Sequence, residues 1–118
     1  MNLNPILKEL EKELGYPVVQ DVYTGEKEIY GVYAYEDERG ELYGDDNPIE
    51  DTAYMRIQIY TPQNYNYMQL KHQTRNCLEA KGFIITGIRS WLEKKLDRNA
   101  DQIRCTVMEM KYTDTHEF

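Results

Sequence analysis

The chain is poor in the side chains that most often carry out catalysis. It has one serine, Ser90, two histidines, His72 and His116, and two cysteines, Cys77 and Cys105, which form no CxxC pair. The glycine-rich phosphate loops GxGxxG and GxxxxGK[ST] are absent, and so is the GxSxG motif of serine hydrolases. A Ser–His–Asp enzyme would need Ser90 with one of the two histidines, and nothing nearby in the sequence supports that arrangement. We therefore predict that the protein is not an enzyme and uses no cofactor.

Basic residues are also scarce relative to acidic ones. The chain has 14 Lys and Arg against 21 Asp and Glu, which gives a formal net charge of −7. Such a surface repels phosphate, so we expect no specific nucleic-acid binding. No apolar run approaches the roughly 20 residues that cross a bilayer, and no signal peptide is visible, so we expect no membrane partner. We expect both cysteines to be reduced and buried, as in a cytosolic protein.

What the sequence does contain is centred on two runs rich in Tyr, Ile and Val, at residues 29–36 and 52–61. In the second run, Met55, Ile57 and Ile59 alternate with polar or amphipathic residues, which is typical of a strand with one buried face. Between the runs, residues 36–51 hold eight carboxylates and one basic residue. We predict a long antiparallel hairpin whose tip is a large acidic loop, broken by Gly40, Gly44 and Pro48.

The remaining elements follow from periodicity and end signals. Helices are predicted over 4–14, capped by Asn4 and ended by Gly15, and from Asn64 or Asn66 to about residue 81. Strands are predicted over 16–23, 83–88 and 103–112, the last covered on both faces. Residues 90–102 fit either a short helix opened by a capping box or a second hairpin, and we favour the hairpin.

The expected order is αβββαββ in a single α+β domain over residues 1–118, with residues 113–118 as a frayed tail. Strands joined by short turns predict a mostly antiparallel β-sheet. The two helices, each with one apolar stripe, are expected to pack against a face of that sheet.

The segment YGVYAYEDERGELYGDDNPIEDTAYMRIQIYT, residues 30–61, resembles the central part of bacteriophage tail terminator, or tail completion, proteins, as found in phages and prophages of Gram-positive bacteria. The resemblance rests on a Tyr-rich strand at 30–35, the Asp46-Asn47 pair, and an Ile-rich strand at 55–60. Gly82-Phe83, between a helix and a strand, also fits it. The order of elements extends the resemblance over most of the chain.

This resemblance implies a non-enzymatic structural protein of virion assembly. In that family, subunits form a homo-oligomeric ring, commonly a hexamer, that caps the tail tube and joins the tail to the head connector. The implied partners are other copies of the chain, the major tail protein and the head-connector protein. The implied location is the head–tail junction of the virion, after assembly in the host cytoplasm. We expect Tyr43, Asp46, Asn47 and Tyr54 to be subunit-interface residues, because tyrosine is enriched at protein interfaces.

Two other classes stay open from the sequence. One is a different phage neck protein or a host protein-binding module of similar fold. The other is a small metal-dependent hydrolase that uses carboxylates of the acidic loop with His72. Asp45-Asp46-Asn47 lacks the spacing of an EF-hand loop, so we expect no metal site there.

Overall fold

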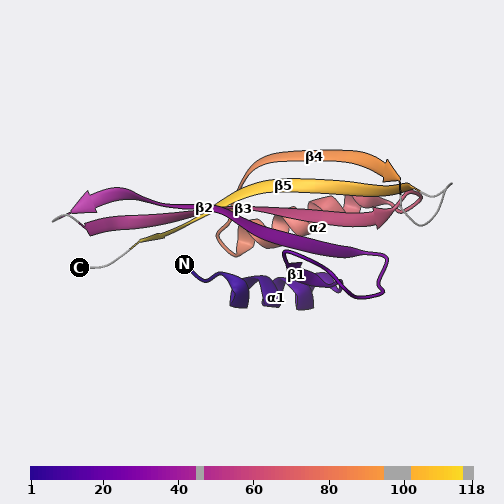
Figure 1. The fold of residues 1–118 in the computed structure, drawn as a ribbon, viewed down its shortest axis with the longest axis horizontal. Helices are drawn as coiled ribbons and strands as arrows, with labels where there is room; N and C mark the ends of the chain where they lie inside the picture. The colour runs from indigo at the N-terminus through magenta and orange to yellow at the C-terminus, as the bar shows by residue number, and fades with distance from the viewer. Residues whose placement is uncertain (45–46, 95–101, 116–118) are drawn as a thin grey trace.

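The computed structural model shows one five-stranded sheet with two helices packed on one of its faces (Figure 1). The structure describes residues 1–44, 47–94 and 102–115, with the backbone alone at 40–44, 47–50 and 115. The elements, in chain order, are α1 (Asn4–Leu14), β1 (Val18–Gln20), β2 (Tyr30–Gly44), β3 (Asn47–Pro62), α2 (Tyr67–Ala80), β4 (Ile84–Lys94) and β5 (Gln102–Thr115). This confirms the predicted αβββαββ order and the α+β class.

The strands lie in the order β1-β2-β3-β5-β4, and all neighbours are antiparallel except β1 and β2. The β1–β2 pair is parallel, with Val18 opposite Gly31, so the expected tight turn between these strands is wrong. A parallel pair needs a connection that returns to the starting end, and residues 21–29 provide it. The strand predicted over 16–23 is shortened because the Tyr16 ring enters the core and Asp21 adopts a positive φ of 64°.

The hydrophobic core lies between the helices and one face of the sheet. As the alternation predicted, Met55, Ile57 and Ile59 of β3 are almost fully buried there, with exposed fractions of 0–2%. Both helices contribute buried leucines to the same cluster: Leu7 and Leu10 from α1, Leu70 and Leu78 from α2. The helices therefore cover the same face, and no helix of the described residues lies on the opposite face of the sheet (Figure 1).

The helix ends were predicted only in part. Asn4 does not cap α1, because the helix begins at Asn4 itself and the Asn4 Oδ1 atom accepts a hydrogen bond from the Tyr35 hydroxyl at 2.6 Å. Asn66 precedes α2 without a side-chain capping bond. Gly15 ends α1 in the left-handed conformation, with φ of 79°, as its position predicted.

The predicted acidic loop is wrong: β2 and β3 stay paired almost to their shared tip. Gly44 lies opposite Asn47 and Tyr43 opposite Pro48, and register shifts near Gly40 and Leu42 absorb the irregular spacing. Pro48 fits because β5 pairs with β3 only from Glu50 onward, which leaves one side of β3 at Pro48 without a partner strand among the described residues. The paired ends form a long arm, visible on the left of Figure 1, and the molecule measures 59 × 25 × 24 Å.

The C-terminal third also differs from the prediction in one respect. The expected frayed tail at 113–118 is wrong for residues 113–115, since β5 continues to Thr115 and the Thr113 hydroxyl lies 3.0 Å from that of Thr52. Residues 116–118 lie outside the described residues. The preferred hairpin reading of 90–102 is confirmed up to Lys94, where β4 ends, and residues 95–101 lie outside the described part.

Candidate protein-interaction site

The arm, defined here as residues 36–44 of β2 and 47–54 of β3, holds the positions predicted to contact another subunit. The backbones of Tyr43 and Asn47 come together near its tip, where Gly44 pairs with Asn47. Asp46 lies outside the described residues. Tyr54 lies at the base of the arm, opposite Asp37 of β2 and Lys111 of β5. The structure thus brings Tyr43 and Asn47 together and sets Tyr54 apart from them.

At the base of the arm, charged and aromatic side chains form a small ordered group. The Arg39 Nε atom donates to Asp37 Oδ2 at 2.6 Å, and this bond holds the pKa of Asp37 below its usual range. The Arg39 guanidinium also lies over the Tyr54 ring, 5.4 Å from its centroid. Tyr54 is half-buried. The sequence predicted that the Tyr54 side chain points away from the helix-covered face. The next residue, Met55, is buried under the helices, and consecutive strand residues point to opposite faces, so the structure is consistent with this prediction.

The sheet face opposite the helices carries a row of three stacked tyrosine rings. Tyr23 stacks on Tyr30 at a centroid distance of 4.4 Å, and Tyr30 stacks on Tyr60 at 5.0 Å. Cys105 lies opposite both Tyr60 and Trp91, so Trp91 on β4 lies on the same face of the sheet, beyond Cys105. Stacked aromatic pairs stabilise the packing of their side chains, and exposed tyrosine rings are common in protein–protein interfaces.

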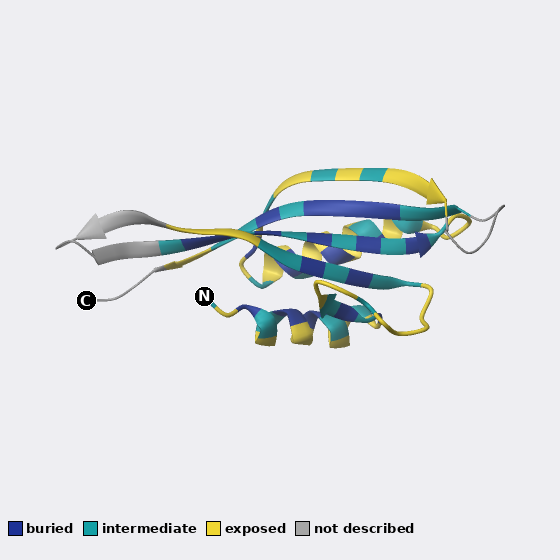
Figure 2. Ribbon diagram, in the orientation of Figure 1, coloured by how far each residue is buried: buried dark blue, intermediate teal, exposed yellow. Residues whose placement is uncertain are grey.

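Two residues of β5 on this face are buried although neither described helix covers them. Cys105 and Val107 are 0% and 2% exposed, yet neither belongs to the core cluster under the helices. Larger neighbours on β3 and β4 flank both residues, which explains their burial. The prediction that β5 is covered on both faces is therefore confirmed for residues 105–108 (Figure 2). The prediction that both thiols are buried holds for Cys105 only, since Cys77 is half-buried.

A charged group lies beside the aromatic row on the same face. Arg56 is 3.8 Å from Glu36, and Arg89 is 3.6 Å from Glu109. Contact with Glu36 raises the pKa of Glu109 above its ordinary value, and burial adds to the rise while both arginines oppose it. These half-exposed pairs contribute little to folding stability. The two ion pairs mean that this face carries both positive and negative side chains, although the chain as a whole is acidic.

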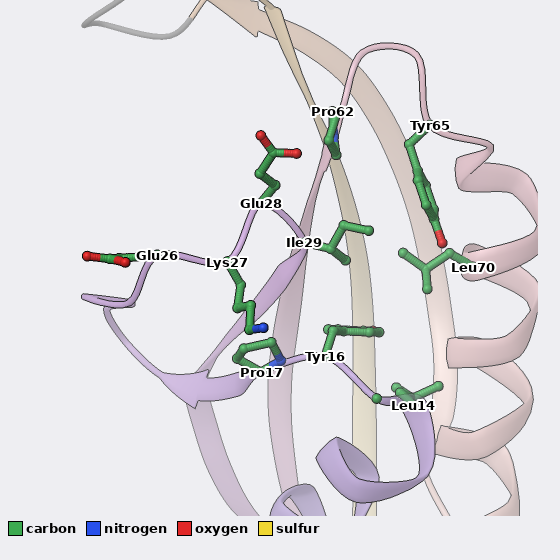
Figure 3. Close-up of a pocket in the computed structure, with 11 residues that line it drawn as sticks. Leu14, Tyr16, Pro17, Glu26, Lys27, Glu28, Ile29, Pro62, Tyr65 and Leu70 are labelled. Carbon is green, nitrogen blue, oxygen red and sulfur yellow. The ribbon is translucent and has the colours of Figure 1, made fainter.

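A separate groove of about 540 Å³ lies where the end of α1, the loop before β2 and the start of α2 meet (Figure 3). Its walls are mostly apolar or aromatic, with Leu14, Tyr16, Ile29 and Leu70 inside and Tyr65 along one side, and Glu26, Lys27 and Glu28 also line it. In Figure 3 the Lys27 side chain points toward Pro17, while Glu26 and Glu28 point outward. The groove is concave and has a few charged residues, but its lining includes no histidine, cysteine or serine.

The residues considered for catalysis are not assembled with one another. The Ser90 hydroxyl donates to the Thr106 hydroxyl at 3.0 Å on β4 and β5, whereas His72 is an exposed residue of α2. His116 lies outside the described residues. Within residues 1–44, 47–94 and 102–115, no three His, Cys, Asp or Glu side chains are grouped as metal ligands. In the same part of the chain no helix is long and apolar enough to cross a membrane.

The sequence analysis did not predict that β4 exposes large apolar side chains at the edge of the sheet. Trp91 and Leu92 are 37% and 41% exposed on the outermost strand, but the sequence did not distinguish strand from helix there. One feature of the sequence could have indicated this surface. Residues 89–94 place large apolar side chains between two basic residues, Arg89 and Lys94.

Comparisons with known proteins report on the fold alone. No protein-family model and no curated protein matches the chain. A solved structure of a protein without a functional name covers 98% of this chain and 91% of its own, with a TM-score of 0.51 and 10% sequence identity. A likeness at that identity shows a shared architecture and carries no activity with it.

Proposed function

We propose that this protein is a bacteriophage tail terminator. Its copies would form a ring, commonly a hexamer in the family that the sequence resembles, on the end of the tail tube. The ring would stop tube growth and join the tail to the head connector. The observation that carries this proposal is the arm, which reaches away from the helix-covered core and forms the middle of the segment 30–61 in which the resemblance lies.

A ring needs contacts between two different surfaces of each subunit, repeated until they close. The arm suits one of these surfaces because it extends beyond the subunit's own core. Residues 36–39 of the arm are exposed, and beyond Glu50, toward the tip, the described part of the arm consists of β2 and β3 without β5. A two-stranded hairpin is only marginally stable alone in water. Packing against a neighbouring subunit would stabilise it.

The charge of the chain supports the same role. Each copy carries a formal charge of −7, so a ring would hold DNA weakly while DNA passes from head to tail. The partners on the two faces of the ring would be the major tail protein and the head-connector protein. Both contacts would be made in the host cytoplasm and retained in the virion.

The proposal is tested by deleting the gene from the phage or prophage that encodes it. Negative-stain electron microscopy of the lysate should show tubes of unregulated length and heads without tails. Supplying the intact gene in trans should restore tails of uniform length joined to heads. Normal joined tails in the deletion strain would refute the proposal.

A further inference from the structure

The outermost strand β4 has a free edge that is unusually long and apolar. It runs for 11 residues and pairs with β5 on one side, and no described strand lies on its other side. Most of its length is exposed or half-buried (Figure 2). Ile84, Trp91 and Leu92 are 53%, 37% and 41% exposed. Natural proteins usually shorten, charge or cover such edges, because the unpaired N–H and C=O groups recruit another strand.

The opposite edge of the sheet has a complementary opening. β1 covers β2 only from Gly31 to Tyr33, so beyond Gln20 the outer edge of β2 has no described strand beside it. A groove of about 580 Å³ lies along this stretch. It is lined by Met1, Asn2, Asn4, Gln20, Tyr35, Glu36, Asp37 and Glu38. An added strand could lie there as a continuation of the position that β1 occupies.

The two edges differ in charge. Glu36, Asp37 and Glu38 line the groove beside β2, where their nearest cations are Arg56, Arg39 and the N-terminal ammonium group of Met1. The edge strand β4 presents Arg89 and exposed Lys94 together with one carboxylate, Glu93. Arg89 is 69% exposed although it lies near Glu109. Opposite charges on facing strands stabilise pairing and like charges weaken it. The excess of carboxylates on one edge and of basic residues on the other favours another copy of the chain as the partner.

We propose that β4 of one copy pairs with the outer edge of β2, beyond Gln20, of the next copy, so that the sheet continues from subunit to subunit. Within the chain β4 runs antiparallel to β2, because three antiparallel pairs separate them. Rotation about a ring axis that lies along the strands preserves this relation, so the new pair is antiparallel. The two edges differ, which makes the contact head-to-tail and able to close.

The alternative pairing of β4 with β4 of a second copy is disfavoured. A full-length antiparallel register would set Ile84 opposite Lys94 and so place Arg89 directly opposite Arg89. Like charges in that position destabilise a strand pair. Such a contact would also give a closed dimer in place of a ring.

This inference rests on the proposed ring, and hydrogen exchange of the full chain tests it separately. Mass spectrometry would follow amide exchange at concentrations below and above self-association. In the assembly, peptides covering 84–94 and 34–38 should exchange at least about tenfold more slowly, because free edge amides become hydrogen-bonded. Assembly without slower exchange in 84–94 would refute the strand pairing while leaving the ring intact. A monomer at every concentration would refute both.

A matched pair of substitutions checks the charge argument. Leu92→Glu adds a carboxylate to β4, where it would face the acidic groove, and should weaken self-association by about tenfold or more. Met68→Glu makes the same change in charge on α2, at a residue 44% exposed against 41% for Leu92. It should leave self-association within about twofold. Circular dichroism must show both variants folded, and equal weakening by the two would contradict the proposed contact.

Discussion

The hydroxyl oxygen of Tyr16 lies 2.8 Å from that of Thr74, although the two residues are 58 positions apart. Tyr16 follows α1 and Thr74 lies in the middle of α2, and their exposed fractions are 5% and 0%. The bond therefore ties the two helical segments together inside the core. Burial raises the pKa of Tyr16, and the hydrogen bond with Thr74 opposes part of the rise.

A double-mutant cycle on this pair should show strong coupling. Tyr16→Phe leaves the Thr74 hydroxyl without its partner, and Thr74→Val does the same to Tyr16, so each should lower the free energy of unfolding by about 1–3 kcal/mol. The double variant removes both polar groups and should lose less than the sum of the two single losses. Urea denaturation measures all four proteins. Simple additivity would show that the two hydroxyls do not stabilise each other.

Truncation of Leu78 tests the packing of α2. Leu78 is fully buried in the core cluster, so Leu78→Ala should reduce the free energy of unfolding by about 2–5 kcal/mol. Met68 lies on the same helix but is 44% exposed, and Met68→Ala should change stability by less than about 1 kcal/mol. Thermal unfolding would separate them. An unchanged melting temperature for Leu78→Ala would mean that this face of α2 does not pack as described.

Alkaline pH should destabilise the sheet face that carries Tyr60 and Cys105. Burial raises the pKa of the Cys105 thiol from 9.0 to about 11, and that of Tyr60 from 10.0 to about 12. The unfolded chain therefore loses these protons at lower pH than the folded chain. Because the folded state binds more protons in this range, stability is retained below pH 9 and falls as the pH rises from 9 to 11.

Urea unfolding at several pH values measures this fall. In Cys105→Ala the thiol contribution is removed, so the decline between pH 9 and 11 should become shallower. Cys77→Ala, which removes the half-buried thiol on α2, is the matched control. If Cys105→Ala declines as steeply as the original chain, the thiol is not held neutral by burial.

Substitution of the arm tyrosine separates assembly from folding. Tyr43→Ala should leave the subunit folded, since the backbone of Tyr43 pairs with Pro48 near the tip of the arm, and should weaken assembly by about 1–3 kcal/mol per contact. Tyr65→Ala removes an exposed tyrosine ahead of α2 and serves as the control. Analytical ultracentrifugation and circular dichroism together provide the test. Parallel losses of fold and assembly in Tyr43→Ala would indicate a structural role for this ring.

The local elements were predictable because their signals are local. The bounds of α1 follow from an apolar stripe and Gly15, and the alternation in residues 54–60 fixes which side chains enter the core. The arm was mistaken for a loop because Gly40 and Pro48 suggest irregular backbone. Pairing between the consecutive strands β2 and β3, with local register shifts, accommodates both residues.

The parts that could not be predicted depend on contacts between distant segments. The parallel β1–β2 pair depends on the path of residues 21–29, which no pattern in the sequence specifies. Among the candidate interface residues, the orientation of Tyr54 followed from its alternation with Met55. The exposed edge at Trp91 did not, because only the sheet order shows that β4 is outermost.

Light scattering of the purified protein over a concentration series tests the central claim most directly, with and without tubes of the major tail protein. If the protein forms a ring, scattering should reveal a closed species of defined size, near six times 14.1 kDa for a hexamer, and that species should bind tube ends. A mass of 14.1 kDa at every concentration, with no binding to tubes, would contradict the account.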